Sequence, residues 1–402
     1  MTARVVITAM GIVSALGDTP GRITRSFKQA RVRFKRLAPA SQVVAPVDDF
    51  DVRRITGPHK NLRYLNRGAA MAVAAAVQAV RNSRLPAPAV QTSGLFVGAG
   101  PNLDMAAECP RIADGAIVSN GLPALWMLRF LPNTAASTIA QLTGIRGDNL
   151  TVGNACAASL QAVGEAFRRI KDGYLDRAVA GGGDSRLNSG ALMAYQKAQA
   201  LYDGPAQPNA ASRPFDQARQ GFVPGEGAAF FVLERADQAL ERHAAILAEV
   251  CGYGASIDGH AMTAPRPDGR WAEQAVHQAL GDARIAADRI DLIVSHGTGT
   301  LLNDAVEADL IERCFSPGRP LVVAFKSWIG HLASACGAVE LALGLCALEA
   351  GHWPAVRNLV APCNSHVNFL CDDRHMKIRA LLLENFGFGG QNAALVVKPW
   401  RP

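Results

Sequence analysis

Among its eight cysteines the sequence has no C-x-x-C pair, and it also lacks an H-E-x-x-H segment, a Walker A loop, a complete G-x-G-x-x-G and a G-x-S-x-G elbow. These patterns mark zinc sites, metalloproteases, P-loop nucleotide hydrolases, dinucleotide-binding enzymes and hydrolases with a serine elbow. None of these classes therefore has motif support. The cysteines mostly lie in apolar surroundings, which is typical of reduced thiols in a cytosolic protein.

Charge is scarce as well, because only 19% of the residues are charged, against about 25% in an average globular chain. With 49% hydrophobic residues among 402, the chain can bury a large core and a sizeable subunit interface, and it is not intrinsically disordered. The excess of lysine and arginine over acidic residues gives a net charge of +7. That excess favours an acidic partner, for which nucleic acid and an acidic carrier protein are the candidates.

Long hydrophobic runs are missing too, because runs such as Ala69–Val80 are shorter than the ~18 residues that a membrane-spanning helix needs. The apolar stretch Val5–Leu16 imitates a signal peptide, but Gly11 and Gly17 interrupt it, and its first residues read equally well as a strand. We therefore expect a cytoplasmic protein without a membrane-spanning helix.

Short β-rich runs alternate with longer helical patterns along the whole chain, which predicts an α/β fold. Strands are predicted at Val5–Thr8, Leu95–Val97, Leu150–Val152, Ala178–Gly181, Ala228–Leu233, Leu292–Ser295, Leu321–Ala324 and Ala393–Val397. Helices are predicted at Leu62–Val80, Cys156–Lys171, Trp271–Leu280, Asp304–Arg313 and His331–Glu349. The charged segment 234–242 is the expected seam between an N-terminal half, residues 1–240, and a C-terminal half, residues 241–402.

One cysteine stands apart from the other seven by its position. The segment Thr151–Ser159 reads as a strand that passes through a tight turn into a helix, with Cys156 at the helix start. The positive end of a helix dipole favours a thiolate and can lower the pKa of such a thiol. Cys156 is therefore a candidate nucleophile, although a free cysteine is more often a small buried hydrophobic residue.

Two histidines and a lysine occupy unusual places in the C-terminal half. His296 lies where a predicted strand opens into a glycine-bearing loop, and His331 begins a helix whose next eight residues are uncharged. Lys326, at the edge of the same apolar segment, needs a partner, for which the buried acid Glu307 is a candidate. A satisfied core histidine is the alternative interpretation of His296.

A glycine-rich turn, Asn385–Asn392, precedes the last predicted strand. It is weak as a phosphate loop because no helix with a P-loop lysine follows, but its backbone N–H groups can approach a substrate. One cysteine, two histidines and such a turn suit a thioester substrate. The thiolate would attack the acyl carbonyl, N–H groups would stabilise the oxyanion, and the imidazoles would donate hydrogen bonds to a second thioester as it becomes an enolate. No metal is expected, because these residues lack the short-range ligand pairs typical of zinc.

Four separated motifs make a family resemblance specific. They are the opening segment Val5–Ser14, Ala180–Asp184, Arg213–Asp216 with Gly221–Gly227, and Phe386–Gly390. With these motifs in order along nearly the whole chain, the sequence resembles the β-ketoacyl-acyl-carrier-protein synthases, the elongating condensing enzymes of the thiolase superfamily. The resemblance implies a five-layer αβαβα sandwich built from two similar halves, normally as a dimer.

The resemblance also implies a catalytic set, namely Cys156, His296, His331 and Lys326. Three further residues would support it: Glu307, Phe386 and Phe388. In this set the cysteine accepts the acyl group, the histidines assist malonyl decarboxylation and condensation, and the N–H groups of Cys156 and Phe388 form the oxyanion hole. The implied product is a β-ketoacyl carrier. The only cofactor involved is the phosphopantetheine arm that the carrier brings.

The sequence departs from the family pattern at three places. Glu384-Asn385 stands where the family usually has Asn-Ser, Leu301 replaces a common proline, and Gln220 replaces a common acidic residue. These positions lie near the acyl and malonyl chambers of the family pattern, so a specialised polyene or polyketide pathway stays open beside fatty-acid synthesis. Two other activities also stay open. A coenzyme A-dependent thiolase is disfavoured by the two histidine motifs, and a non-elongating chain-length partner would be expected to lack the nucleophile.

Several basic residues match regions where the family docks its acidic carrier, namely Lys60, Arg63, Arg67 and Arg129. An ordinary solvated face is the alternative interpretation. The denser basic cluster at 31–36 has no nucleic-acid-binding module around it, so no nucleic-acid partner is expected. The expected partners are an acyl carrier protein and a second ketosynthase-like subunit, in a homodimer or a heterodimer.

Overall fold

The computed structural model describes residues 3–37, 41–104, 111–118, 122, 124–316 and 318–401. Its largest sheet has ten strands in the spatial order β12-β11-β15-β16-β10-β1-β9-β8-β4-β7. In chain order these are β1 (Val5–Val13), β4 (Gly94–Gly98), β7 (Asn149–Val152), β8 (Arg177–Ser185), β9 (Glu226–Arg235), β10 (Ala248–Ile257), β11 (Leu292–Val294), β12 (Leu321–Val323), β15 (Leu381–Gly387) and β16 (Gln391–Lys398).

The sheet consists of two halves with the same topology. The order β1-β9-β8-β4-β7 in one half corresponds to β10-β16-β15-β11-β12 in the other. In each half the first two pairings are antiparallel and the last two are parallel. The halves meet where β1 pairs with β10 antiparallel over three residue pairs. The predicted duplication is therefore present in the strand order.

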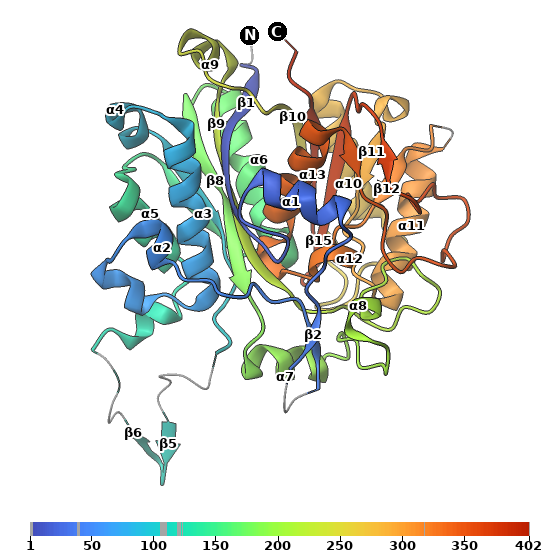
Figure 1. Cartoon of the computed structure of the whole chain (residues 1–402), viewed down its shortest axis with the longest axis horizontal. Helices are drawn as coiled ribbons and strands as arrows, with labels where there is room; N and C mark the ends of the chain where they lie inside the picture. The colour runs from blue at the N-terminus through green and yellow to red at the C-terminus, as the bar shows by residue number, and fades with distance from the viewer. Residues whose placement is uncertain are drawn as a thin grey trace.

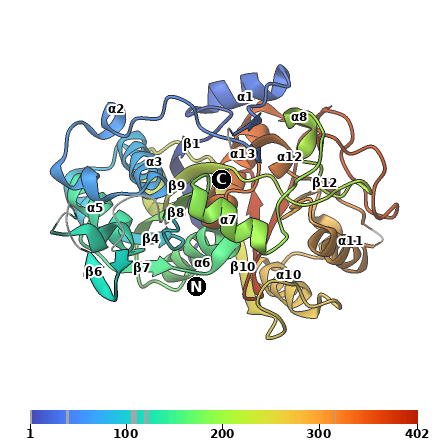
Figure 2. The same ribbon diagram turned by 90° about the horizontal axis from the view of Figure 1, so that it is seen from below.

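Helices form three layers around the two half-sheets, as Figure 1 shows from one side to the other. Two central helices, α6 (Ala158–Lys171) and α13 (Cys336–Ala350), contact each other and strands of both halves. The outer layers are α3 (Arg67–Ser83) with α5 (Thr134–Thr143), and α10 (Arg270–Ala283) with α11 (Leu301–Phe315). The view from below in Figure 2 keeps α3 and α5 on one flank and α10 and α11 on the other. This arrangement confirms the expected five-layer α/β sandwich.

The remaining elements are short and lie in the connections. The helices are α1 (Pro20–Lys28), α2 (Arg53–Thr56), α4 (Ala87–Gln91), α7 (Ser189–Lys197), α8 (Pro208–Ala211), α9 (Ala236–Glu241) and α12 (Lys326–Ile329). The 3₁₀ turns are η1 (Lys60–Tyr64), η2 (Trp126–Arg129), η3 (Ala155–Ala157), η4 (Ala287–Arg289) and η5 (Ala333–Ala335). Three two-stranded sheets pair β2 (Lys35–Arg36) with β3 (Val43–Val44), β5 (Arg111–Ala113) with β6 (Ala116–Val118), and β13 (His352–Trp353) with β14 (Arg374–His375).

Every strand predicted from the sequence is present in the ten-stranded sheet, whereas β10 and β15 of that sheet and the short strands of the two-stranded sheets were not predicted. Glycines break the apolar pattern of β10, and α10 requires them, because a Cβ on Gly252 would lie 2.2 Å from the Ala279 carbonyl oxygen. The predicted helix His331–Glu349 is too long at its start, since α13 begins at Cys336. The backbone of His331 instead forms a bridge, with its N–H donating to Val223 and its carbonyl accepting from Gly225.

One described segment, Ala333–Ala350, is long and apolar enough to span a membrane. The sequence prediction overlooked it. Because 83% of this span is buried inside the protein, it is a core helix of the central layer. Core helices of large domains are hydrophobic all round for the same reason.

Candidate active site

The connection from β7 to α6 places Cys156 at the end of a half-sheet. Cys156 lies in η3, directly before α6, and the preceding Ala155 has a φ of 45°. A left-handed backbone costs a residue with a Cβ roughly 1–2 kcal/mol, so tertiary contacts must hold this turn. The other half repeats the turn with Ala333 at φ 47° before Ser334. Ser334 is thus the counterpart of Cys156, and only the N-terminal half has a thiol at this position.

The structure brings together the three side chains on which the sequence argument depended. The Sγ of Cys156 and one ring nitrogen each of His296 and His331 all lie within 4.8 Å of one another. The two imidazole rings meet edge to face with centroids 5.6 Å apart. His296 follows β11 and His331 follows α12, so residues 140 and more positions away from Cys156 converge on it.

Hydrogen bonds orient both imidazoles in the same sense. The N–H of Ala333 donates to His331 Nδ1 over 3.0 Å, and Lys326 Nζ lies 3.1 Å from His296 Nδ1. Because each Nδ1 accepts a hydrogen bond, each neutral ring carries its proton on Nε2. Each ring is therefore a hydrogen-bond donor at Nε2.

Burial keeps both histidines neutral. It lowers the pKa of His331 to about 3, with the charge of Lys326 acting in the same direction. It also lowers the pKa of His296 well below the ordinary value, again assisted by Lys326. Neither imidazole is positively charged near neutral pH, so neither can act there as a preformed acid.

The same arrangement does not suit a metal ion. A metal at the Nε2 of His331 would require the proton to sit on Nδ1, where Ala333 already donates. The Lys326 ammonium beside His296 would also repel a cation. The residues therefore do not fit a zinc site.

Lys326 pairs with Glu340 and not with Glu307, so the predicted partner was wrong. Lys326 Nζ lies 2.6 Å from Glu340 Oε1, and both side chains are only 1% exposed. Asn385 donates to Glu340 Oε2 over 2.8 Å and has its Nδ2 3.3 Å from His296 Nδ1. The pair thus forms one network with His296. Glu340 was overlooked in the sequence, although it is the first charged residue after an uncharged stretch, which is a usable signal.

Glu307 does not pair with Lys326 but holds the backbone of the His296 loop. Its two carboxylate oxygens accept the N–H groups of His296 over 2.5 Å and Gly297 over 2.8 Å. Asn303 adds a third donor at 3.0 Å. Lys326 and Glu307 therefore act on His296 from different sides, one at the ring and one at the backbone.

The expectation of a lowered thiol pKa is wrong for Cys156 in this structure. Burial raises its pKa to about 11, against the opposing effects of the Lys326 charge and a hydrogen bond from the Phe388 N–H. Desolvation thus outweighs the groups that favour the thiolate. With its pKa raised to about 11, the Cys156 side chain rests as a thiol near neutral pH.

The glycine turn after β15 lies against the cysteine. A Cβ on Gly387 would lie 2.9 Å from Cys156 N, so this position requires the close backbone approach that glycine allows. Phe388 follows with its N–H toward the thiol and its ring 38% exposed at the surface. Phe386 is buried, with its ring centroid 5.9 Å from that of His296. The turn thus brings the Phe388 N–H group close to Cys156 and its N–H group, and it places the Phe386 ring beside His296.

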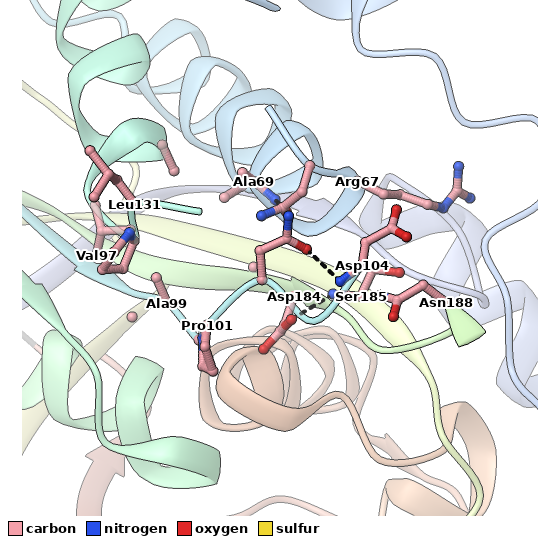
Figure 3. A pocket seen from close by; sticks show the side chains of 18 of the residues that line it. Arg67, Ala69, Val97, Ala99, Pro101, Asp104, Leu131, Asp184, Ser185 and Asn188 are labelled. Carbon is pink, nitrogen blue, oxygen red and sulfur yellow. Dashed lines mark hydrogen bonds between the residues drawn. The ribbon is translucent and has the colours of Figure 1, made fainter. Parts of the chain in front are cut away.

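A cavity of about 230 Å³ is lined by the loop after β4, the start of α3 and the end of β8. Pro101 and Asp184 lie side by side in its wall in Figure 3. Arg186 joins them, because it donates to the Pro101 carbonyl and lies 2.9 Å from Asp184. Asp184 also accepts the Ser334 hydroxyl over 2.7 Å. The charges of Asp184 and Arg186 act on Cys156, so this buried ion pair borders both the cavity and the nucleophile. The sequence analysis missed Arg186.

The basic residues singled out for carrier docking fall into two groups. Lys60 and Arg63 are exposed on η1, and the Arg129 guanidinium donates to the Arg63 carbonyl, which holds them close together. Arg67 starts α3 and makes two hydrogen bonds of 2.7 and 2.8 Å to Glu226, whose carboxylate is buried. Arg67 is therefore engaged within the fold.

Comparison with known proteins gives a consistent assignment. Residues 2–239 match the N-terminal domain of β-ketoacyl synthase, and residues 247–360 match its C-terminal domain. The 3-oxoacyl-[acyl-carrier-protein] synthase 2 of Coxiella burnetii is 31% identical over 98% of both chains. A β-ketoacyl synthase assigned to the polyketide actinorhodin in Streptomyces coelicolor is 31% identical over 98% of this chain and 88% of the relative.

Solved structures agree with the sequence matches. The ishigamide ketosynthase/chain length factor matches all of both chains with a TM-score of 0.90 at 29% identity. A β-ketoacyl synthase from Burkholderia phymatum matches 99% of this chain and all of its own with a TM-score of 0.89 at 27% identity. The chain therefore belongs to the β-ketoacyl synthase family, the acyltransferases that extend an acyl chain by condensation.

Proposed function

We propose that Cys156 is the residue that accepts the acyl group. In the loading step a bond forms between Cys156 Sγ and the acyl carbon, the carrier thioester breaks, and the thiol proton ends on the carrier sulfur. The N–H groups of Cys156 and Phe388 stabilise the tetrahedral oxyanion. Losing one such donor costs on the order of a hundredfold to a thousandfold in rate. The observation that carries the proposal is the convergence of this thiol with two neutral imidazoles within 4.8 Å.

The two histidines act in the malonyl half-reaction. As the bond to the carboxylate breaks and carbon dioxide leaves, negative charge moves onto the thioester oxygen of the malonyl group. The Nε2–H groups of His296 and His331 donate to that oxygen and stabilise the enolate. The enolate carbon then attacks the acyl group on Cys156, whose sulfur leaves and takes up a proton. The product is a β-ketoacyl thioester two carbons longer.

The Lys326–Glu340 pair fixes the tautomer of His296. A cation 3.1 Å from Nδ1 makes that nitrogen an acceptor, so the ring proton stays on Nε2, where the enolate forms. Glu340 in turn helps to keep this buried lysine charged. Burial lowers the pKa of Lys326, but the charge and hydrogen bond of Glu340, together with the charges of Cys336 and Glu307, raise it above the ordinary value. No metal and no resident cofactor takes part in these steps.

The substrates are acyl groups carried by an acyl carrier protein in the cytoplasm. The relatives named as acyl-carrier-protein synthases support this choice, and so does the net charge of +7, because carrier proteins are acidic. We assign carrier docking to the exposed Lys60 and Arg63, together with the half-buried Arg129 that donates to the Arg63 carbonyl. Relatives from both fatty-acid and polyketide synthesis support either of these pathways for this chain. The chain would act as a homodimer or as the active subunit of a heterodimer, and a related ketosynthase/chain length factor supports the second form.

Intact-protein mass spectrometry after incubation with acyl carriers and malonyl carrier tests the assignment. Cys156→Ala abolishes acyl loading, whereas Cys346→Ala, at a buried cysteine in the middle of α13, retains it. His296→Ala and His331→Ala keep loading but lose decarboxylation. Loading that persists in Cys156→Ala would overturn the assignment. A wild-type chain that never loads would instead favour the non-elongating chain-length partner.

A further inference from the structure

Glu384 is a fully buried carboxyl group in the middle of β15. Neither of its oxygens accepts a hydrogen bond from a nitrogen or hydroxyl donor among the described residues. Its neighbour Asn385 points to the opposite face of the strand, where it reaches Glu340 and His296. An unpaired carboxylate in such a place would be very costly, so Glu384 requires a partner.

The partner is Glu307 on α11. Strand β15 pairs with β11 so that Leu383 lies opposite Val294, which places Glu384 beside the start of the His296 loop whose backbone Glu307 holds. The two carboxyl groups are there within reach of a hydrogen bond, and the Glu307 charge acts on Glu384. Two buried carboxyl groups in contact cannot both be ionised, and a hydrogen bond between them needs one proton. Glu307 already accepts three donors, from His296, Gly297 and Asn303, which favours its ionised form. The shared proton therefore lies on Glu384.

We propose that Glu384 is a positioning residue: its protonated carboxyl group donates to the Glu307 carboxylate and so fixes the backbone of the His296 loop. The chain of contacts runs from Glu384 to Glu307, and from Glu307 to the N–H groups of His296 and Gly297. Glu384 touches no reacting atom, so its effect on catalysis passes through the placement of His296. The catalytic consequence rests on the role proposed for His296, whereas the shared proton does not.

Several charged or titratable groups surround the two carboxyls. On α11 they are Asp304, which raises the pKa of Glu307, and Cys314, whose own pKa the Glu384 charge raises. From α12 the Lys326 charge opposes them, although Glu340 already pairs with it. The Arg219 guanidinium adds a positive charge 3.8 Å from Asp304. These groups leave the pair with a net excess of negative charge, which favours retention of one proton.

Burial raises the pKa of both Glu384 and Glu307 above the ordinary value. An acid with a raised pKa binds its proton more tightly in the folded than in the unfolded chain. The free energy of unfolding therefore decreases as the pH rises from the ordinary value toward the raised one. Above the raised pKa, two adjacent carboxylates repel each other and disturb the His296 loop. The proposal thus predicts an alkaline loss of condensation.

The experiment compares E384Q, E384L and the control L382V, which lies on the same face of β15 without a carboxyl contact. E384Q keeps a neutral donor to Glu307, so it rescues condensation to within about twofold of wild type and removes the alkaline loss. E384L removes the donor and lowers condensation about tenfold, while acyl loading of Cys156 stays within about twofold. L382V keeps the wild-type pH profile. Equal condensation in E384L and E384Q, or an unchanged alkaline limb in E384Q, would overturn the proposal.

Two measurements test the shared proton without relying on activity. At neutral pH, the infrared difference spectrum between wild type and E384Q contains the carbonyl band of a protonated carboxylic acid. The free energy of unfolding of E384Q also depends less on pH than that of wild type. A difference spectrum with carboxylate bands alone would contradict a protonated Glu384, even if the enzyme proved inactive. These two measurements use only wild type and E384Q, so they test the proposal even if E384L fails to fold.

Discussion

The Lys326–Glu340 pair allows a quantitative prediction, because both ions are buried and the geometry is close. Lys326→Met removes the ammonium and leaves the Glu340 carboxylate with Asn385 as its remaining donor. Breaking a buried pair by deleting one partner costs about 3–5 kcal/mol, because an uncompensated charge stays behind. Chemical denaturation of Lys326→Met should show a loss of this size in the free energy of unfolding.

The double variant Lys326→Met with Glu340→Leu removes both charges and fills the space with apolar atoms. Replacing a whole buried pair in this way is often nearly neutral for stability. The double variant should therefore be more stable than Lys326→Met alone, which means strong coupling in a double-mutant cycle. Both variants lose condensation, because His296 Nδ1 loses its cationic partner in each.

The pH dependence of Lys326→Met checks the same reasoning. Burial already raises the pKa of Glu340, and the charge of Lys326 opposes that rise. Without the lysine the carboxyl group protonates more readily when folded, so the free energy of unfolding falls as the pH rises above the ordinary carboxyl value. Lys326→Met is thus closest to wild type in acid. A loss below about 1 kcal/mol at neutral pH, or additive effects in the cycle, would refute a tightly coupled buried pair.

Three further predictions concern the cavity that Asp184 lines, the histidines and the proposed docking surface. The double variant Arg186→Ala with Asp184→Asn removes the buried ion pair and opens the cavity to Cys156. Loading should then extend to longer acyl carriers, because each further buried CH₂ group is worth about 0.8 kcal/mol. An unchanged chain-length profile would show that the ion pair does not limit the cavity. Burial lowers the pKa of His331 to about 3. The rate of malonyl decarboxylation should therefore not fall as the pH drops through the ordinary pKa of histidine. A loss of activity centred on that pKa would contradict the statement that both imidazoles are neutral hydrogen-bond donors. Arg63→Glu should raise the KM for the carrier several-fold at low salt and less at high salt. The control Lys377→Glu changes an exposed charge in the other half of the chain and should leave this KM unchanged. Equal effects of the two variants would argue against docking at η1.

The sequence was sufficient for the fold class because short apolar runs separated by helical patterns can pack only as α/β layers. It failed where tertiary contacts override the local pattern. The polar pair Glu384 and Asn385 interrupts the apolar pattern of β15, so the sequence did not predict this strand. Both side chains face residues that lie far away along the chain. Strand β10 was not predicted because its glycines interrupt the apolar pattern. These glycines allow α10 to pack closely against the strand, which is a tertiary contact and not a local preference.

Local motifs were likewise sufficient to single out Cys156, His296, His331 and Lys326, which the structure brings together, because each stands in a connection beyond the end of a strand. Their partners were decided only by the three-dimensional arrangement. Whether Lys326 meets Glu307 or Glu340 depends on which acid α11 or α13 turns toward it. The thiol pKa depends on how deeply the finished fold buries Cys156. Residue type and order determine which groups are available for chemistry, whereas distances and solvent exclusion, which set hydrogen bonds and charge, arise only when distant segments pack together.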